Sequence, residues 1–401
     1  MSHPLFPDLG TADTLRATKG SAPLRVNSHI HLPPNFSAFT SVAQTLALAD
    51  AQDVRVLGAS NYYDYTVYTD FAKQAAAHGI FPLFGLEIIS LEPQLRDAGV
   101  KINDPGNPGR FYLCGKGITH FAPLTAEAAT LLEVIRRSDR ARMAAMIDLL
   151  EAQFASVGAA TGLTEEAIKA QIVARHGCPP ETVFLQERHL AQAFQEALFA
   201  QSECSEALEK LCGTAIAATD AAGVQNALRS HLMKAGKPAY APENFVDFDH
   251  AYRLILALGG VPVYPTLADG ASPLCGFEED PDRLVEELKR RGIYAAELIP
   301  IRNSPEVLTR FVTAYREAGI IVTAGTEHNT PELLALEPTC KKGVPIPEPL
   351  QAIFWEGACV LAAHQYLTAR GEEGYTAQPS TEARIADFAH LGAAVIRQYR
   401  S

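Results

Sequence analysis

The chain has 401 residues, of which 47% are hydrophobic and 20% are charged, and its formal net charge at pH 7 is −12. This composition is typical of a soluble globular enzyme, and the length exceeds what one core usually supports unless the fold is a large barrel. The acidic balance argues against a broad nucleic-acid-binding surface, and no apolar run is long enough to cross a membrane.

The cysteines and the first residues of the chain indicate the compartment. The seven cysteines are scattered, and no Cys-x-x-Cys pair occurs, so the sequence predicts neither a disulfide framework nor a zinc ribbon. The opening stretch MSHPLFPDLGTADTLRATKG has no basic segment followed by an apolar run, so we expect no signal peptide. A reducing cytoplasm is the expected setting.

Short apolar strands alternate with helical segments in two separate blocks. Three of the intervening helices end at Gly79, Gly292 and Gly319, as helices with glycine C-caps do. The repeated strand–helix order predicts parallel strands, and about seven of them predict a barrel. The expected strands are 24–31, 54–61, 81–89 and 110–117 in the first block, and 261–269, 294–301 and 320–328 in the second.

The region between the two blocks has helical periodicity almost throughout. The runs RSDRARMAAMIDLLEAQF, LTEEAIKAQIVARHG and RHLAQAFQEALF have apolar residues at helical spacing, and LTEE suggests a capping box with Thr164 at the N-cap. We therefore expect an inserted helical subdomain at 125–235 and a discontinuous barrel formed by 1–124 and 236–401.

Acidic residues and histidines gather at three of the expected strand ends. In RVNSHIHLPP, His29 and His31 are two residues apart on a strand and so project to the same side. Glu87 ends the third strand, and Glu327 and His328 end the last. Functional groups of parallel barrels collect at these ends, so the set predicts a site for at least one divalent cation. The alternative is that each is a solvated or hydrogen-bonded loop residue.

The other strand ends carry phenols, an amide and an arginine. Asn61 and Tyr62 follow the second strand, and Tyr112 and Tyr264 belong to the fourth and fifth. The tyrosines are either packing groups whose hydroxyls find partners, or donors to a substrate oxyanion or phosphate. Arg302, after the sixth strand, is a candidate partner for an anionic substrate group.

The order of these motifs resembles the PHP (polymerase and histidinol phosphatase) superfamily, and most closely its stand-alone metal-dependent phosphoesterases, over about residues 24–330. His29-x-His31 resembles the opening H-x-H of that family, and GLEIIS resembles its G-I-E-I-S motif. The stretches RSDRARMAAMIDLL, LTEEAI and ERHLAQAF are similar to its helical insertion, and AGIIVTAGTEHNTP is similar to its closing strand. The resemblance implies an α/β fold, a distorted (β/α)7 TIM-like barrel, with several metal ions at its mouth.

The chain departs from the pattern of that family at several ligand positions. Residues 60–62, Ser-Asn-Tyr, stand where the family has T-D-H, and Tyr112 and Tyr264 stand where it has histidines. Glu327 keeps the closing acid, but His328 follows it at once, where the family places one residue between them. The aspartate that follows the family's H-x-H has no counterpart in LPPNFSAF.

This reduced set predicts one metal ion. A neutral phenol is a poorer ligand for a divalent ion than imidazole or carboxylate, and its pKa near 10 opposes ionisation. We therefore expect one ion, Zn, Mn or Fe, held by His29, His31, Glu87 and Glu327, with His328 bound to the ion or beside its ligands.

Three functions are consistent with this site. The first is a metal-dependent hydrolase acting on a small anionic substrate, with a phosphoester as the leading class and Tyr62, Tyr112 and Tyr264 as catalytic groups that orient it. Asn61 and Arg302 would bind that substrate. The second is a metal-dependent isomerase or lyase on a sugar acid. The third is a PHP-like binding protein without turnover. The sequence leaves the oligomeric state open.

Overall fold

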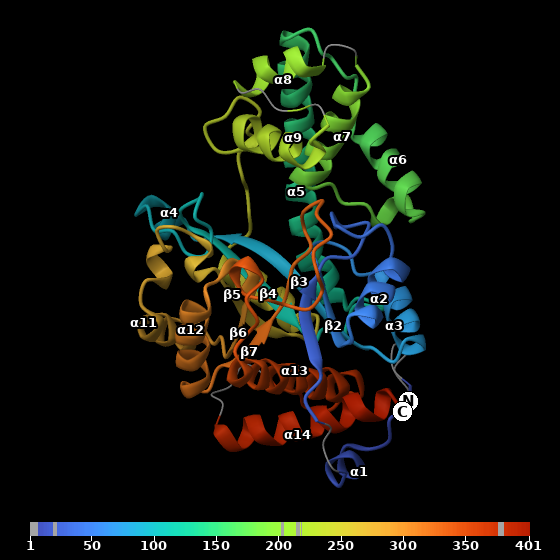
Figure 1. Cartoon of the computed structure of the whole chain (residues 1–401), viewed down its shortest axis with the longest axis vertical. Helices are drawn as coiled ribbons and strands as arrows, with labels where there is room; N and C mark the ends of the chain where they lie inside the picture. The colour runs from blue at the N-terminus through green and yellow to red at the C-terminus, as the bar shows by residue number, and fades with distance from the viewer. Residues whose placement is uncertain (1–6, 19–21, 202–203, 214–216, 218, 376–380) are drawn as a thin grey trace.

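Seven strands form one sheet that curls into a nearly closed barrel in the computed structural model of the chain (Figure 1). The strands follow one another around the barrel in chain order. All seven expected strands are present, and the last three end three or four residues earlier than predicted. Their bounds are β1 Arg25–Ile30, β2 Val54–Asn61, β3 Phe81–Leu91, β4 Arg110–Lys116, β5 Val261–Thr266, β6 Ala295–Leu298 and β7 Ile321–Ala324. The structure describes residues 7–18, 22–201, 204–213, 217, 219–375 and 381–401.

The direction of β4 corrects the expectation that all strands are parallel. β1, β2 and β3 are parallel to one another, as are β5, β6 and β7, but β4 is antiparallel to both of its neighbours. β3 and β4 form a hairpin whose ladder extends from Gly85–Lys116 to Leu91–Arg110. A hairpin needs no crossover helix. As a result β4 begins at the end of the barrel where the parallel strands finish.

The barrel closes between β1 and the residues that follow β7. The backbone N–H groups of Thr326 and Glu327 donate to the carbonyl of His29, at 3.1 and 2.8 Å, and the N–H of His31 donates to the carbonyl of Glu327 at 2.9 Å. The closing strand therefore ends directly beside the H-x-H segment, as the barrel prediction requires.

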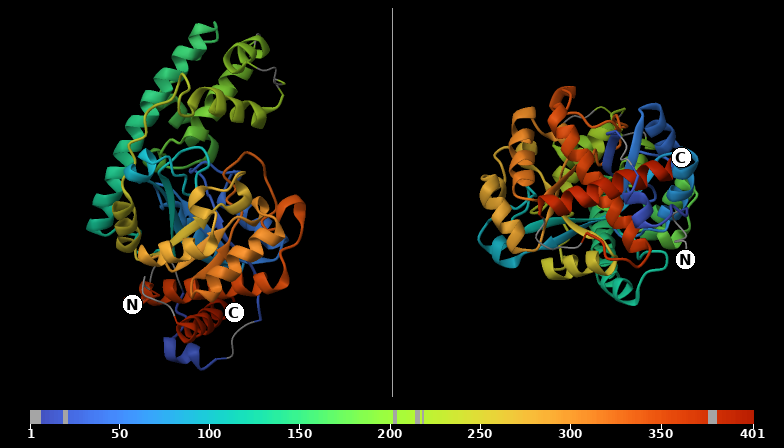
Figure 2. Two further views of the ribbon diagram at one scale, coloured as in Figure 1. Left: turned by 90° about the vertical axis from the view of Figure 1, so that its left-hand side faces the viewer. Right: turned by 90° about the horizontal axis from the view of Figure 1, so that it is seen from below.

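Helices cover the outside of the barrel and one of its ends. Figures 1 and 2 show α13 and α14 lying across the end opposite the inserted helices. The helices outside the insertion are α1 Ala12–Arg16, α2 Val42–Ala51, α3 Val67–Ala77, α4 Pro93–Asp97, α10 Phe248–Ala257, α11 Pro281–Arg290, α12 Pro305–Glu317, α13 Glu348–Ala369 and α14 Glu382–Tyr399. The short 3-10 helices there are η3 Ala268–Gly270, η4 Gly276–Glu278, η5 Pro300–Arg302 and η6 Lys341–Gly343.

Alternate strand positions belong to two different hydrophobic cores. Val56, Val261 and Val263 pack in the core that includes α13 and α14. Leu57 and Tyr264, one position away from these residues, pack in the core formed with the surrounding helices. Because side chains alternate along a strand, this division separates the groups that line the barrel from those that face outward.

The described part of residues 126–233 is largely helical and has a hydrophobic core of its own, which includes Leu150, Phe154 and Phe194. We retain 125–235 as the proposed inserted subdomain. Thr164 caps α6 as expected, but Ala167 occupies the third helical position, so the reciprocal half of a capping box cannot form. The elements are α5 Ala126–Ser156, α6 Glu165–His176, η1 Pro180–Thr182, α7 Glu187–Phe199, α8 Cys204–Cys212, α9 Ala221–Leu228 and the π-helix η2 Arg229–Met233.

Among the described helices, none combines the length and the apolar character that a membrane span requires.

Candidate metal centre

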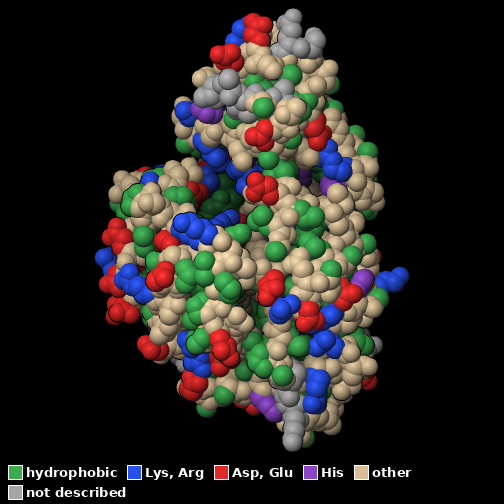
Figure 3. All heavy atoms as spheres, viewed as in Figure 1, with side chains coloured by type: hydrophobic (Ala, Val, Ile, Leu, Met, Phe, Trp, Pro, Cys, Tyr) green, Lys and Arg blue, Asp and Glu red, His purple; other side chains and the backbone are tan. Residues whose placement is uncertain are grey.

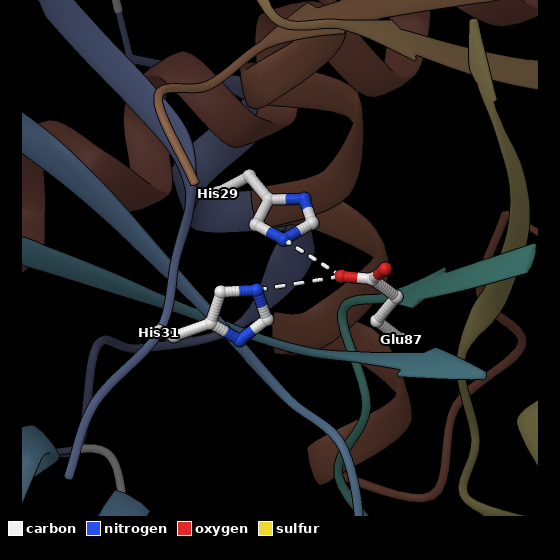
Figure 4. Close-up of side chains that lie close together, drawn as sticks. All are labelled: His29, His31 and Glu87. Carbon is white, nitrogen blue, oxygen red and sulfur yellow. Dashed lines mark ion pairs between the residues drawn. The ribbon is translucent and has the colours of Figure 1, made fainter. Parts of the chain in front are cut away.

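The structure brings His29, His31 and Glu87 together inside the mouth of the barrel. His29 lies on β1, His31 follows that strand, and Glu87 lies on β3. The Nε2 atoms of the two histidines lie 3.5 and 3.4 Å from Oε2 of Glu87. Figure 4 shows both rings directing these nitrogens at the carboxylate. All three side chains are buried.

This arrangement fits a metal ion. Nε2 of His29, Nε2 of His31 and Oε2 of Glu87 have no hydrogen-bond partner among the described residues, although each atom is buried. Buried polar atoms normally have partners, so three unpartnered atoms that converge point to a missing ligand. Two nitrogens and a carboxylate oxygen are usual zinc ligands, and around a tetrahedral ion such atoms lie about 3.4 Å apart. The measured separations from Glu87 match that spacing.

A second carboxylate fixes the orientation of His29. Oε1 of Glu297, on β6, lies 2.7 Å from Nδ1 of His29. A carboxylate in this position keeps the proton on Nδ1 and leaves the lone pair of Nε2 free for an ion. Nζ of Lys116 lies 2.9 Å from the other oxygen of Glu297. Burial alone would raise the pKa of Glu297, but His29 and Lys116 outweigh it and lower the pKa to about 2.

The electrostatics of the cluster favour a cation. Burial lowers the pKa of His29, but the carboxylates of Glu297 and Glu87 together outweigh it and the pKa rises to about 9. Burial lowers the pKa of His31, against the opposing effect of Glu87. In the absence of an ion, a protonated His29 ring would supply the positive charge between the carboxylates of Glu87 and Glu297. A bound cation would supply the positive charge that this proton supplies.

Tyr62 holds two of the candidate ligands in place. Its hydroxyl donates to Oε1 of Glu87 at 2.7 Å, and its ring stacks on the ring of His31 with centroids 5.3 Å apart. Burial, reinforced by Glu87, raises the pKa of Tyr62 well above its usual value. The phenol thus stays protonated and acts on the site as a hydrogen-bond donor.

A cavity of about 520 Å³ opens above the cluster. His29, Glu87 and Glu297 contribute to its lining, and Figure 3 shows a hollow between the insertion and the barrel with Lys and Arg side chains at its edge. A smaller cavity lined by Arg110 and by insertion residues such as Arg142 shares five lining residues with it. The shared residues are Tyr62, Tyr112, Arg188, Arg229 and Asn329.

Tyr112 and Arg188 face this space with free polar groups. β4 begins at the mouth of the barrel, so Tyr112 lines the cavity although it lies near the start of its strand. Its hydroxyl forms no hydrogen bond to a described residue. Arg188, on α7, forms no ion pair with a described carboxylate, and its guanidinium carbon lies 6.0 Å from the centre of the Phe36 ring.

Glu327 lines the same cavity but does not join the ligand cluster found among the described residues. Both of its carboxylate oxygens bind the guanidinium of Arg302, and one also accepts from Asn329 Nδ2 at 2.8 Å. The structure thus separates the predicted ligand Glu327 from His29 and His31. It pairs Glu327 with the predicted substrate-binding residue Arg302.

The structure does not support His328 as a metal ligand. Its Nδ1 lies 2.8 Å from Thr326 Oγ1, its Nε2 lies 3.0 Å from the carbonyl of Leu334, and its ring stacks on Phe39. Glu327 and His328 have φ values of 60° and 54°, and this left-handed turn sends the two side chains to different sides. Glu327 lines the cavity, and His328 does not.

Asn61 and Tyr264 also lie outside the cavity lining. The Asn61 side chain donates to the carbonyl of Leu32 and accepts from its N–H, each at 2.9 Å, so it fixes the backbone beyond β1. The Tyr264 hydroxyl donates to Oε1 of Glu278 at 2.9 Å within the outer core. Strand alternation turns both away from the barrel interior, which sequence position alone did not reveal.

Sequence reasoning missed Glu297, Lys116 and Arg188. Glu297 and Lys116 are fully buried on β6 and β4. The sequence did contain a signal for both residues: Glu297 stands inside the apolar run YAAELIPI, and Lys116 inside RFYLCGKG. A charged residue in a buried strand rarely lacks a partner, so each of them indicates a buried ion pair. Arg188 begins an amphipathic helix, and nothing in its local sequence distinguishes it from a solvated arginine.

Comparisons with known proteins identify relatives of the fold. No family model and no curated protein matches the sequence. An amidohydrolase from Chromobacterium violaceum, whose structure contains sulfate and no metal, matches with a TM-score of 0.51 at 18% identity over 82% of this chain and 96% of that chain. A protein from Bifidobacterium adolescentis assigned as a metal-dependent phosphoesterase matches with a TM-score of 0.51 at 17% identity, over 84% and 96%. These likenesses show a shared α/β barrel fold.

Proposed function

We propose that this protein is a metal-dependent hydrolase of a small anionic substrate, with a phosphoester as the leading class. The observation that carries the proposal is the convergence of three buried, unpartnered ligand atoms, from His29, His31 and Glu87, at the base of a cavity edged by arginines. The two structural neighbours, one an amidohydrolase and one assigned as a phosphoesterase, are consistent with hydrolysis.

One ion would be held by His29, His31 and Glu87. Three protein ligands leave a further position open for water or substrate, as in catalytic rather than structural metal sites. When bound, the ion would polarise a substrate oxygen and lower the pKa of water at the site. Imidazole and carboxylate ligands suit Zn, Mn and Fe, so the donor set allows each of them.

The chain's own residues would orient these groups. Glu297 keeps the His29 tautomer that presents Nε2, and Tyr62 holds Glu87 through its hydroxyl. Burial raises the pKa of Tyr112, so its phenol would donate a hydrogen bond to a substrate oxygen instead of accepting a proton as a base. The tyrosines at the mouth are therefore proposed as donors and positioning groups.

Arginines would select an anionic substrate. Burial and the nearby Arg229 lower the pKa of Arg188 to about 10, so its guanidinium still carries a full charge at neutral pH. Arg302 is already paired with Glu327, whereas Arg188 has no described carboxylate partner. Arg188 is thus the guanidinium best placed to gain a charge-assisted bond when an anion enters.

The test measures metal content and turnover together. Chelator-treated protein, reloaded with Zn²⁺, Mn²⁺ or Fe²⁺, is assayed with p-nitrophenyl phosphate and bis(p-nitrophenyl) phosphate. Glu87→Gln should lose both the ion and turnover, whereas Glu327→Gln should retain the ion because that carboxylate binds Arg302. Metal-loaded protein that hydrolyses no ester, phosphoester or amide of a broad panel would refute hydrolysis and favour an isomerase, a lyase or a binding protein.

A further inference from the structure

A buried lysine stands on the far side of Glu297 from the candidate metal centre. Lys116 is 1% exposed, and its Nζ lies 2.9 Å from the carbonyl of Ser28 and 2.8 Å from Oγ of Ser60. Its third contact is Oε2 of Glu297, at 2.9 Å. The first two contacts are hydrogen bonds, and the third is an ion pair at a distance at which Glu297 Oε2 has no hydrogen-bond partner among the described residues. The positive charge is therefore held at a fixed point inside the barrel.

Two glycines, Gly58 and Gly85, lie next to the oxygens that accept hydrogen bonds from this ammonium. A Cβ atom at Gly58 would lie 2.3 Å from the carbonyl oxygen of Ser28, and one at Gly85 would lie 3.0 Å from Oγ of Ser60. Both oxygens are the neutral acceptors of Lys116. Because a Cβ atom at either glycine would crowd one of these oxygens, the two glycines allow Ser28 and Ser60 to keep the positions from which they accept the lysine's hydrogen bonds.

The same position is bordered by a second set of metal-type ligands. His29, Cys114 and Glu297 offer ligand atoms within 4.8 Å of one another, and all three residues are buried. A second ion here would be held by the thiolate of Cys114 and the carboxylate of Glu297, and it would use Nδ1 of His29 only as a bridging imidazolate, because Nε2 of that ring faces the first site. Here Nδ1 of His29 is engaged by Glu297, and the other oxygen of Glu297 is engaged by Lys116.

We propose that Lys116 takes the place of a second metal ion, so that this centre binds one divalent cation and not two. The inference rests on the metal site proposed above. The ammonium neutralises Glu297, holds it against His29 and repels any cation that approaches Cys114 and Glu297. Lys116 is a positioning residue, because it acts on the ion through Glu297 and His29 and contacts neither ion nor substrate.

The test is metal stoichiometry. Chelator-treated wild-type protein is titrated with excess Co²⁺, freed of loose ions by gel filtration and analysed for cobalt, with the absorption spectrum recorded. We expect one equivalent and no thiolate-to-cobalt charge-transfer band. Lys116→Ala, which removes the ammonium and opens space, should bind two equivalents and show that band. Lys116→Arg, which keeps the charge, should bind one.

Each result separates the inference from the proposed function. A Lys116→Ala/Cys114→Ser double variant should return to one equivalent, because the second ion needs the thiolate. Folded Lys116→Ala protein that binds one equivalent would overturn the inference and leave the metal site standing. Zero equivalents in the wild type would overturn the metal site itself. If Lys116→Ala does not fold, Lys116→Met, which removes the charge and keeps most of the side-chain volume, takes its place with the same expected result. A second equivalent in the wild type, in the presence of Lys116, contradicts the inference in either case.

Discussion

Nδ1 of His29 lies 2.7 Å from Oε1 of Glu297, and both side chains are buried inside the barrel. The opposite ring nitrogen, Nε2, faces Glu87. The imidazole of His29 therefore lies between two carboxylates. Glu297 sets the orientation of the ring, and Glu87 is the other candidate ligand of the same ion. This relationship makes Glu297 as important to the proposed centre as the three ligands, although it touches no ion.

Glu297→Gln tests that role. The amide keeps the shape of the side chain but removes the charge that orients His29, and loss of such a partner typically costs 10–100-fold in metal affinity. We expect a fall of about that size in Zn²⁺ affinity, measured by competition with a chromogenic chelator. The matched control is Glu278→Gln, another fully buried glutamate, whose partners are Tyr264 and backbone N–H groups. Equal losses of affinity in the two variants would contradict the assignment.

Tyr112→Phe and Tyr264→Phe should have opposite effects. The Tyr264 hydroxyl donates to buried Glu278, so its removal should lower the free energy of unfolding by about 1 kcal/mol and leave turnover unchanged. The Tyr112 hydroxyl faces the cavity without a described partner, so its removal should leave stability nearly unchanged and raise KM. Urea denaturation and steady-state kinetics measure both; a fall in turnover confined to Tyr264→Phe would reverse the two assignments.

The barrel was predictable from sequence because it depends on local patterns. The seven strands were predicted from short apolar runs, and three of the helices between them were recognised by a glycine at the helix end. The antiparallel direction of β4 was not predictable. Two successive apolar strands can be joined either by a hairpin, which makes them antiparallel, or by a crossover, which makes them parallel. The closure of β1 against residues 326–327 is likewise a long-range contact, which no short stretch specifies.

The placement of the candidate ligands was predictable where they share a strand or lie at strand ends of one mouth, and less so elsewhere. His29 and His31 were placed together by the two-residue repeat of a strand, and Glu87 by the rule that parallel strands end at one mouth. His328 and Tyr264 were misplaced because a left-handed turn and strand alternation decide where their side chains point. The position of Glu297 beside His29 depends on closure of the barrel, which leaves only β7 between β6 and β1.

Arg188→Gln should weaken binding of the anionic substrate. A hydrogen bond to a charged group contributes about 1.5–3 kcal/mol, so we expect KM to rise roughly tenfold to a hundredfold with little loss of stability. Arg175→Gln is the control, because that arginine pairs with Glu196 on the surface of the insertion. Inhibition by inorganic phosphate provides a second measure. An unchanged KM and phosphate inhibition constant in Arg188→Gln would exclude Arg188 from the binding site.

Asp139, on α5 at the edge of the smaller cavity, should make stability depend on pH. Burial raises the pKa of its carboxyl to about 7, although Arg142 opposes the shift. Between about pH 4 and pH 7 the folded protein then binds more protons than the unfolded chain, so stability falls as pH rises through this window. Asp139→Asn removes the effect. Relative to wild type, the variant should gain about 2–3 kcal/mol in free energy of unfolding from pH 5 to pH 8, because two pH units lie between pH 5 and the folded pKa. If the free energy of unfolding changed with pH in the same way in the two proteins, the raised pKa of Asp139 would be contradicted.

Elemental analysis of protein purified without chelator tests the central claim most directly. The claim is that His29, His31 and Glu87 hold one divalent ion in the barrel mouth. The predicted result is one equivalent of Zn, Mn or Fe per chain, which falls steeply in Glu87→Gln and persists in Glu327→Gln. A chain that holds no ion after reloading, or that keeps its full metal content in Glu87→Gln, would contradict this account.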